Sequence, residues 1–399
     1  QWTYNSGSAT LSHDTSGWIL AVSRNGTNLT VTGVSQFPGT PSALPLSDPM
    51  PGYALVSIGD YAFYHCTSLA SVTIPDSVTS IGNAAFLYCT SLASVTIPDS
   101  VTSIGDDAFA MCTNITSVTI PDSVTTIGSY AFAWCTSLAS VTIPETVTSI
   151  GDGIFYGCTS LASVTVPGSV TNIGDSAFAA CIALTSVTIP DSVTNIGNYA
   201  FYGCSALISA TIPDSVTSIG SYAFNGCTVL TSAIPDSVTY FGSHAFYNCS
   251  ALTSATMGNG VTNISDYVFY NCRSLISVTM PDSVTSIGDN AFGGCTSLAS
   301  VAIPDSVTNI GGFAFSDCTS LTSVTIPDGV TYIGSYAFAY CSALASVTIG
   351  NSVTSIGNSA FDGCTSLTSI IVHPDNPKYS SGDGILFNKT MSILILCPG

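Results

Sequence analysis

The 23 residues CTNITSVTIPDSVTTIGSYAFAW, at positions 112–134, are one copy of a unit that recurs along most of this chain. Successive copies begin 23 residues apart, except for one step of 22 residues between Cys227 and Cys249. A fixed period of roughly 20 to 50 residues is typical of a solenoid, in which each coil stacks on the next. The cysteines that mark the copies stand at positions 66, 89, 112, 135, 158, 181, 204, 227, 249, 272, 295, 318, 341 and 364.

The unit predicts two short extended pieces followed by a tight turn. In the copy before the quoted one, residues 94–97 (SVTI) alternate polar and apolar side chains, as a half-buried strand does. Pro98 ends this strand, because proline has no N–H to donate. A second extended piece, residues 101–104, leads to Gly105, where we expect a positive φ. Residues 106–111 then leave room for about one helical or 3₁₀ turn.

Stacking in register places equivalent residues above one another, about 4.8 Å apart. A phenylalanine column therefore runs from Phe63 to Phe361 without a break, and a leucine column runs from Leu69 to Leu367 with Ile115 as its only replacement. We interpret both columns as the hydrophobic core. One unit cannot bury its apolar face alone, so each coil depends on its neighbours for stability.

The repeated motif LxSVTIPxSVTxIGxxAFxxC resembles the BspA-like class of bacterial leucine-rich repeats over residues 53–372. The tail, residues 375–379 (DNPKY) and 383–389 (DGILFNK), resembles a variant segment of the same family. The resemblance implies a parallel sheet on one face and short helical or 3₁₀ turns on the other. It also implies surface or secreted proteins that act in adhesion and protein–protein contact, and it does not imply an enzyme.

We predict three regions along the chain. Residues 1–52 break the period and contain strand-like pieces separated by turns, which predicts an N-terminal β-rich cap. Residues 53–372 form the leucine-rich-repeat solenoid of about 14 turns, irregular near 227–271. Residues 373–399 predict a β-hairpin cap at the second end. Both open ends of a solenoid expose apolar surface and need such covers.

The composition is acidic and poor in charge. Four Lys and Arg residues stand against 23 Asp and Glu residues, which gives a net charge of −19. Nucleic-acid binding needs clustered basic residues, so nucleic acid is excluded as a partner, as are anionic membrane surfaces. No apolar run approaches the ~20 residues that span a membrane. A chain that begins at Gln1 fits a mature protein after signal removal, and we expect an extracellular or cell-surface location.

Fourteen of the fifteen cysteines occupy one inward position beside phenylalanine. Cysteine behaves there as a small hydrophobic residue, which favours buried reduced thiols. Disulfides between adjacent coils remain an alternative, because stacked Cα atoms would lie within the distance range of a disulfide. A linear column does not surround a metal ion tetrahedrally, so a zinc site is not expected. Cys397 lies outside the column.

An outward Ser–x–Thr pattern on the predicted strands gives the first candidate interface. Threonine is a good strand former with a polar side chain, so a soluble sheet accounts for the pattern. The alternative is a regular lattice of hydroxyl and methyl groups that matches a repetitive partner such as ice, a crystalline polysaccharide or a second solenoid. The residues that represent this lattice are Thr73, Thr96, Thr119 and Thr142.

A second outward column is acidic and follows the proline of each unit. Like charges on adjacent coils repel, so we expect either turn chemistry or a cation to offset them. Carboxylate oxygens are ligands that Ca²⁺ prefers, and Ca²⁺ is the only cofactor we consider. The absence of an EF-hand loop counts against a calcium site, and turn chemistry is the favoured account. The candidate calcium ligands are Asp76, Asp99, Asp122, Asp191 and Asp214.

The shortened turn marks the main irregularity. Its strand, residues 230–235 (LTSAIP), lacks one residue, which shifts a side chain to the other face unless a distortion absorbs the loss. In the next turn Ser265 replaces glycine and Val268 replaces alanine. A drifting repeat accounts for these changes, and a docking site is the alternative. Aromatic residues favour contact surfaces, and this region predicts a second interface on the turn side: Tyr240, His244, Tyr247, Tyr267, Tyr270 and Arg273.

No catalytic motif is present: the chain has no HExxH, GxSxG, P-loop or CxxC sequence, and its four histidines are dispersed. We therefore expect a non-enzymatic surface or secreted structural protein that acts by protein–protein contact. Near-identical coils give repeated contacts, which favours self-assembly into a filament or layer. The first alternative is an adhesin that binds a protein or polysaccharide of a host or neighbouring cell. The second alternative is ice binding through the Ser–x–Thr lattice.

Overall fold

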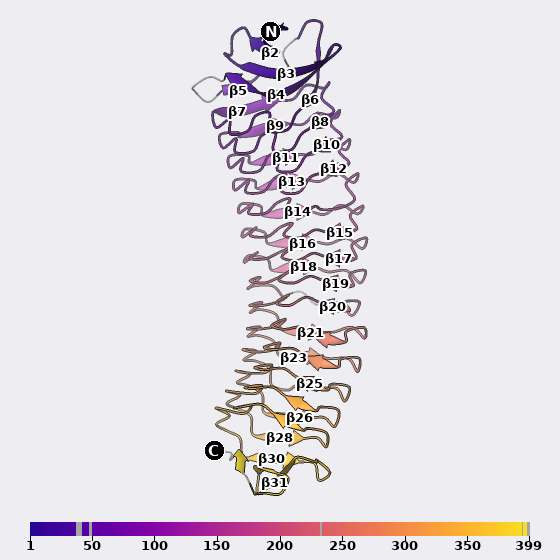
Figure 1. Ribbon diagram of the computed structural model, residues 1–399, viewed down its shortest axis with the longest axis vertical. Helices are drawn as coiled ribbons and strands as arrows, with labels where there is room; N and C mark the ends of the chain where they lie inside the picture. Colours follow the sequence, from indigo (N-terminus) through magenta and orange to yellow (C-terminus); the bar gives the residue numbers. More distant parts are fainter. Residues whose placement is uncertain (37–41, 48–49, 232–233, 393, 397–399) are drawn as a thin grey trace. The chain divides into compact units, whose positions relative to one another are not determined.

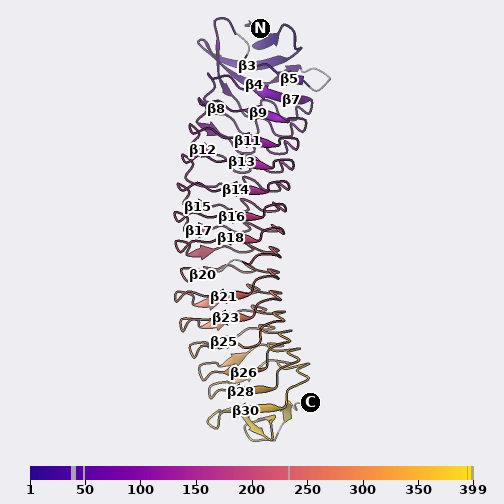
Figure 2. The same cartoon turned by 180° about the vertical axis from the view of Figure 1, so that it is seen from behind.

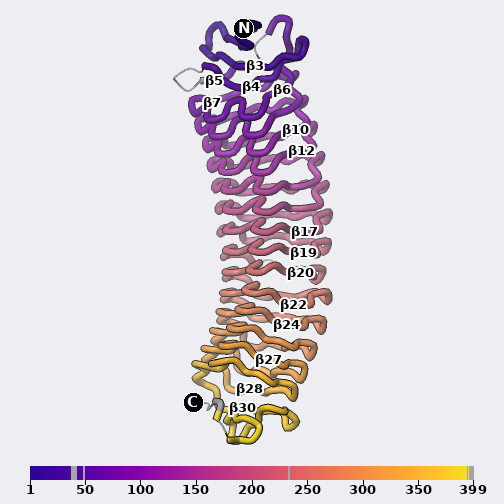
Figure 3. The backbone as a smooth tube through the Cα atoms, viewed as in Figure 1, coloured from indigo at the N-terminus to yellow at the C-terminus, as the bar shows by residue number. Residues whose placement is uncertain are grey.

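The computed structural model describes residues 1–36, 42–47, 50–231, 234–392 and 394–396. These residues form two compact units, one comprising Gln1–Val193 and Ala200–Leu207 and the other Thr194–Tyr199 and Ile208–Gly399. In each unit the chain winds into coils that stack as successive rungs, visible as a ribbon and as a tube (Figure 1, Figure 3). The predicted β-solenoid of stacked parallel strands is confirmed.

The first unit opens with an antiparallel sheet. Its strands are β1 (Trp2–Asn5), β2 (Thr10–His13), β3 (Ile19–Asn25) and β4 (Asn28–Gln36). Strand β4 is hydrogen-bonded in parallel with β6 (Ala54–Ile58), where the repeating ladder begins. The indole N–H of Trp2 donates to the carbonyl oxygen of Pro45 at 2.8 Å, so this buried ring keeps its hydrogen bond.

Most coils contribute two short strands, and equivalent strands pair in parallel (Figure 2). A proline follows most first strands and limits their length, because it cannot donate to the ladder. In the first unit, the first strand column contains β7 (Leu69–Thr73), β9 (Ser94–Thr96), β11 (Ser117–Thr119), β13 (Ser140–Thr142), β14 (Ser163–Thr165) and β16 (Ser186–Thr188), with β5 (Ser42–Leu44) paired to β7. The second strand column contains β6, β8 (Ser80–Ile81), β10 (Ser103–Ile104), β12 (Thr126–Ile127) and β15 (Asn172–Ile173).

The second unit repeats this arrangement and ends in an antiparallel sheet. Its first strand column contains β18 (Ser209–Thr211), β21 (Ser254–Thr256), β23 (Ser277–Thr279), β26 (Ser323–Ile326), β28 (Ser346–Ile349) and β30 (Ser369–Val372). Its second strand column contains β17 (Asn195–Ile196), β19 (Ser218–Ile219), β20 (Tyr240–Phe241), β22 (Asn263–Ile264), β24 (Ser286–Ile287), β25 (Asn309–Ile310), β27 (Tyr332–Ile333) and β29 (Ser355–Ile356). The antiparallel strands are β31 (Tyr379–Gly382), β32 (Ile385–Asn388) and β33 (Leu394–Leu396).

The prediction of helical or 3₁₀ turns is wrong, since no helix occurs in the described ranges. Asp107 and Met111 have φ values of 54° and 59°, in the left-handed region that interrupts a right-handed helix. Alternate amides therefore point along the stack. The N–H groups of Asp107 and Phe109 donate to the next coil, to the oxygens of Ser129 (2.9 Å) and Ala131 (2.8 Å). The turn is thus a third ladder between coils.

Gly105 also departs from expectation, because the positive φ falls on Asp107 and not on the glycine. A Cβ atom at Gly105 would lie 2.6 Å from the backbone nitrogen of Asn83 in the preceding coil. Glycine is needed here because two backbones approach closely, and not because the turn is left-handed.

Phenylalanine and cysteine fill the core together. The rings of Phe63 and Phe86 stack with centroids 5.0 Å apart and an interplanar angle of 11°. All fourteen column cysteines are buried free thiols, which confirms that part of the prediction. The Sγ of Cys112 donates to the carbonyl oxygen of Phe86 at 3.2 Å. Burial raises the pKa of Cys135 to about 12, so this thiol stays protonated at neutral pH. Cys397 lies outside the described residues.

Candidate contact surfaces

The Ser–x–Thr lattice is an exposed face of the first unit. Thr73 pairs in register with Thr96, and Thr119 pairs with Thr142, with the intervening valines turned inward. All four threonine side chains are exposed. Within the described part of the chain their hydroxyl groups make no hydrogen bond to the protein, so each hydroxyl retains its donor and both acceptor sites for a partner.

Threonines elsewhere on the same coils behave differently. The Oγ1 of Thr102 donates to the carbonyl oxygen of Thr79 at 3.2 Å, and that of Thr125 donates to Thr102 at 3.4 Å. These hydroxyl groups link successive coils, because each donates its hydrogen bond to a backbone oxygen of the protein. The two kinds of threonine therefore separate a structural column from a surface whose hydroxyls are unused.

The predicted calcium ligands Asp76, Asp99, Asp122, Asp191 and Asp214 are all exposed. The hydrogen bond at this turn comes instead from the serine that follows, since Ser77 Oγ donates to the oxygen of Leu55 at 2.6 Å. Among the described residues, no group of three or more His, Cys, Asp or Glu side chains is placed to hold a metal ion. The calcium site stays a prediction.

A different acidic and amide column stabilises the stack, and sequence reasoning missed its role. Asp60 Oδ1 accepts a hydrogen bond from the backbone N–H of Asn83 at 2.7 Å, and Asn83 Oδ1 accepts one from Asp106 at 2.8 Å. Each side chain thus caps the next coil and not its own turn. The recurrence of Asp, Asn or Ser directly after the Ile-Gly pair is the signal that could have revealed this ladder.

An aromatic column crosses the turns of the second unit. The rings of Tyr199 and Tyr222 stack at 4.8 Å, those of Tyr222 and His244 at 4.4 Å, and those of His244 and Tyr267 at 4.5 Å. All four residues have left-handed backbones, with φ between 56° and 61°. Partial burial lowers the pKa of His244, and the nearby carboxylate of Asp266 opposes this shift.

The other predicted interface residues occupy three separate places. Tyr247 and Tyr270 stack on each other at 5.0 Å beside the aromatic column. Arg273 is exposed on the coil that follows. Tyr240 is not on the turn side as expected, because it belongs to β20 and lines a cavity. The shortened strand that prompted the docking-site hypothesis includes Ser232 and Ala233, which lie outside the described residues.

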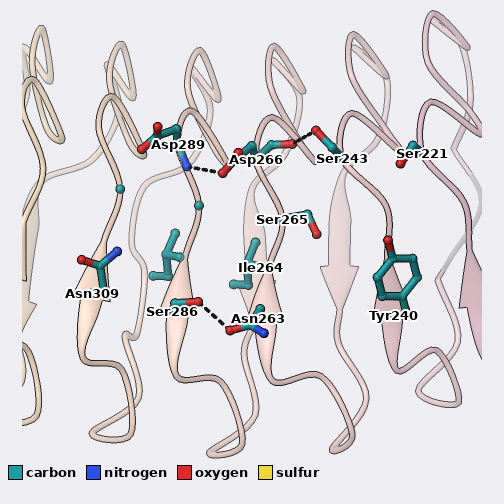
Figure 4. Close-up of a pocket in the computed structure, with 13 residues that line it drawn as sticks. Ser221, Tyr240, Ser243, Asn263, Ile264, Ser265, Asp266, Ser286, Asp289 and Asn309 are labelled. Carbon is teal, nitrogen blue, oxygen red and sulfur yellow. Dashed lines mark hydrogen bonds between the residues drawn. The ribbon is translucent and has the colours of Figure 1, made fainter.

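The cavity is a polar groove of about 490 Å³ within the second unit (Figure 4). Tyr240 stands at one end, and Asn263, Ser286 and Asn309 follow one another along β22, β24 and β25. The groove lies where the second strand column is interrupted: β20 is the last strand of one sheet, and β22 is the first strand of the next.

A stack of parallel two-residue and three-residue strands around leucine, phenylalanine and cysteine columns defines a leucine-rich-repeat solenoid. The model of the BspA-type leucine-rich repeat region, six copies of the unit, matches residues 56–185, 171–299 and 262–389. The chain therefore belongs to the BspA-type leucine-rich repeat family. No curated protein sequence matches it.

Solved structures of bacterial proteins share the fold. A leucine-rich repeat protein from Bacteroides ovatus is 31% identical over 89% of this chain and 92% of that protein, with a TM-score of 0.65. A leucine-rich cell surface protein from Faecalibacterium prausnitzii is 34% identical over 90% and 94%, with a TM-score of 0.56. The pneumococcal vaccine antigen PcpA, 18% identical with a TM-score of 0.54, resembles the chain in fold alone.

The described residues contain no helix that is long and apolar enough to cross a membrane.

Proposed function

We propose that this protein is a non-enzymatic structural protein of a cell surface or its surroundings, and that it self-associates through the Ser–x–Thr lattice. Membership of the BspA-type family and similarity to a protein described as a cell surface protein support the location and contact through protein surfaces. The observation that carries the proposal is the row of exposed hydroxyl groups at Thr73, Thr96, Thr119 and Thr142, which make no hydrogen bond to any described residue.

The chemistry of the lattice suits contact between two copies of the chain. A hydroxyl group both donates and accepts, so a surface of hydroxyls is complementary to itself. A molecule with a net charge of −19 repels its copies across most faces. The strands that pair Thr119 with Thr142 carry Ser, Val and Thr alone, so two lattices can meet there without bringing carboxylates together. The in-register repeat then multiplies one weak contact along the stack.

The test compares two double variants of the full chain by analytical ultracentrifugation and electron microscopy. Thr96→Glu with Thr142→Glu places charges on the lattice, and Ser103→Glu with Ser149→Glu places the same charges on the same coils away from it. We expect the native chain and the second variant to form particles that grow with protein concentration, and the first variant to stay monomeric.

Monomers at every concentration for the native chain would overturn self-association. Saturable binding of that monomer to a surface protein or polysaccharide would then support the adhesin alternative, and shaping of ice crystals would support the ice-binding one. Assemblies that disappear when calcium is chelated would assign the cation to the acidic column at Asp76, Asp99, Asp122, Asp191 and Asp214.

A further inference from the structure

The groove of the second unit arises from one change in the repeat. Most coils have a glycine after the second strand, because a Cβ there would meet the backbone of the preceding coil; at Gly311 it would lie 2.6 Å from the nitrogen of Asp289. Ser265 occupies this position instead, and its Oγ donates to the oxygen of Phe241 at 2.5 Å. Strands β20 and β22 do not pair beside this serine, and the cavity extends over the surface of these and the adjoining coils, from Ser221 to Gly311.

The side chains around this space keep unused polar atoms. Asp266 Oδ1 accepts from the N–H of Asp289 at 2.8 Å, and Asp289 Oδ1 accepts from the N–H of Gly312 at 2.6 Å. Each carboxylate is thereby fixed in place and has its second oxygen available. Within the described residues the carboxamide of Asn309 makes no hydrogen bond, so it offers both a donor and an acceptor.

An aromatic side chain ends the row. Tyr240 is 55% exposed and lies at the edge of the groove beside Asn263 (Figure 4). Its ring offers a flat apolar face and its hydroxyl a polar tip. The lining thus combines carboxylate acceptors, amide groups and one aromatic surface in a cavity of about 490 Å³, a volume within the usual range for small-molecule sites.

The negative charge of the residues that line the groove limits which ligands can bind there. Two carboxylates and no Lys or Arg residue line the groove, so anionic ligands are repelled. Unused carboxylate oxygens need donors, and the hydroxyl groups of a sugar are donors whose ring carbons also carry an apolar C–H face. A neutral sugar therefore satisfies the acidic, amide and aromatic groups together.

We propose that the groove between Tyr240 and Asn309 binds a neutral oligosaccharide. The proposal is independent of self-association, since the groove and the Ser–x–Thr lattice belong to different units. Asp266 and Asp289 accept hydrogen bonds from sugar hydroxyls, Asn309 both donates and accepts, and the ring of Tyr240 packs against one sugar ring.

The experiment titrates the full chain with neutral trisaccharides, namely cellotriose, laminaritriose, maltotriose and chitotriose, and with trigalacturonate as the anionic comparison. Saturation-transfer NMR detects binding and calorimetry measures affinity. In neighbouring coils, Ser218 stands at the position of Tyr240 and Ser286 at the position of Asn309. Tyr240→Ser and Asn309→Ser are therefore both expected to fold. Tyr332→Ser is the matched control, because Tyr332 lies at the same position outside the groove.

We expect at least one neutral trisaccharide to bind and trigalacturonate to fail. Tyr240→Ser is expected to weaken binding about tenfold through lost aromatic contact, and Tyr332→Ser to leave it unchanged. Absence of binding by all four neutral trisaccharides would overturn the proposal, as would equal effects of Tyr240→Ser and Tyr332→Ser. Binding of trilysine in their place, suppressed by salt, would assign the groove to a basic protein segment and would also overturn it.

Discussion

The Ser–x–Thr lattice of the first unit and the groove of the second unit are built from the same repeat, yet they offer opposite kinds of surface. The lattice presents the same threonine on each coil, in register and exposed. The groove presents three kinds of side chain on four successive coils, namely Tyr240, Asn263, Ser286 and Asn309. Strict repetition yields a uniform surface suited to a uniform partner, whereas a local departure from it yields an open groove with mixed chemistry.

The largest expected effect concerns the glycine that sets the spacing of the coils. Gly105→Ser places a Cβ against the backbone of Asn83, which cannot move without disturbing the ladder. We expect a loss of about 2 to 3 kcal/mol in the free energy of unfolding, the upper part of the range for overpacking. Urea denaturation followed by circular dichroism measures this change.

Ser265→Gly is the counterpart in the groove, because it restores the residue of the regular coils. It removes one hydrogen bond, from Ser265 to Phe241, and should cost about 1 kcal/mol or less. If Gly105→Ser and Ser265→Gly lowered the free energy of unfolding equally, glycine would not be required at this position in the regular coils while serine is tolerated beside the groove.

The next effect concerns the side chains that cap the following coil. Asn83→Ala leaves the N–H of Asp106 without its acceptor and should destabilise the protein by about 1 kcal/mol. Asn83→Asp keeps the acceptor and should have little effect. Ser129 occupies the same position in a coil of the first unit, and its side chain makes no hydrogen bond there within the described residues. Ser129→Ala is thus the control, and denaturation midpoints compare the three variants.

The period predicted the fold well, because it fixes which side chains stack. The columns that begin at Phe63, Cys66 and Leu69 are buried along both units, as their spacing required. The outward position of Thr96 also followed from strand alternation. The conformation between the strands was predicted wrongly. Asp107 and Met111 have left-handed backbones that hydrogen bonds to the next coil stabilise, and residue type alone does not indicate them.

The groove shows a second limit of the sequence. The aromatic pattern predicts Tyr240 on the turn side with His244. The segment VTYFG, however, aligns with VTSIG of the preceding coil, and this alignment places Tyr240 on a strand. This alignment predicts the strand position of Tyr240, but the one-residue deletion in the shortened turn shifts the register and hides it. No pattern predicted that the strand pairing would be interrupted beside Ser265, because that depends on contacts between backbones one coil apart.

The smallest expected effect concerns pH and the aromatic column. Burial lowers the pKa of His244 in the folded protein, although Asp266 opposes the shift. The unfolded chain, with an ordinary pKa of about 6.5 for this residue, then binds more protons than the folded chain as pH falls through that value. The contribution of His244 to stability is therefore complete above pH 6.5 and decreases on acidification.

His244→Tyr restores the residue found at Tyr222 and Tyr267 and removes this titration while keeping the stack. We expect the variant to lose less stability than the native chain between pH 7.5 and pH 5.5, by well under the ~1.4 kcal/mol of a full pKa unit, because solvent screens this partly exposed imidazole. Thermal melts across this range measure the difference. Tyr222→His adds a second imidazole to the same column and should enlarge the acid sensitivity; if it reduces that sensitivity, the column does not disfavour the charged ring.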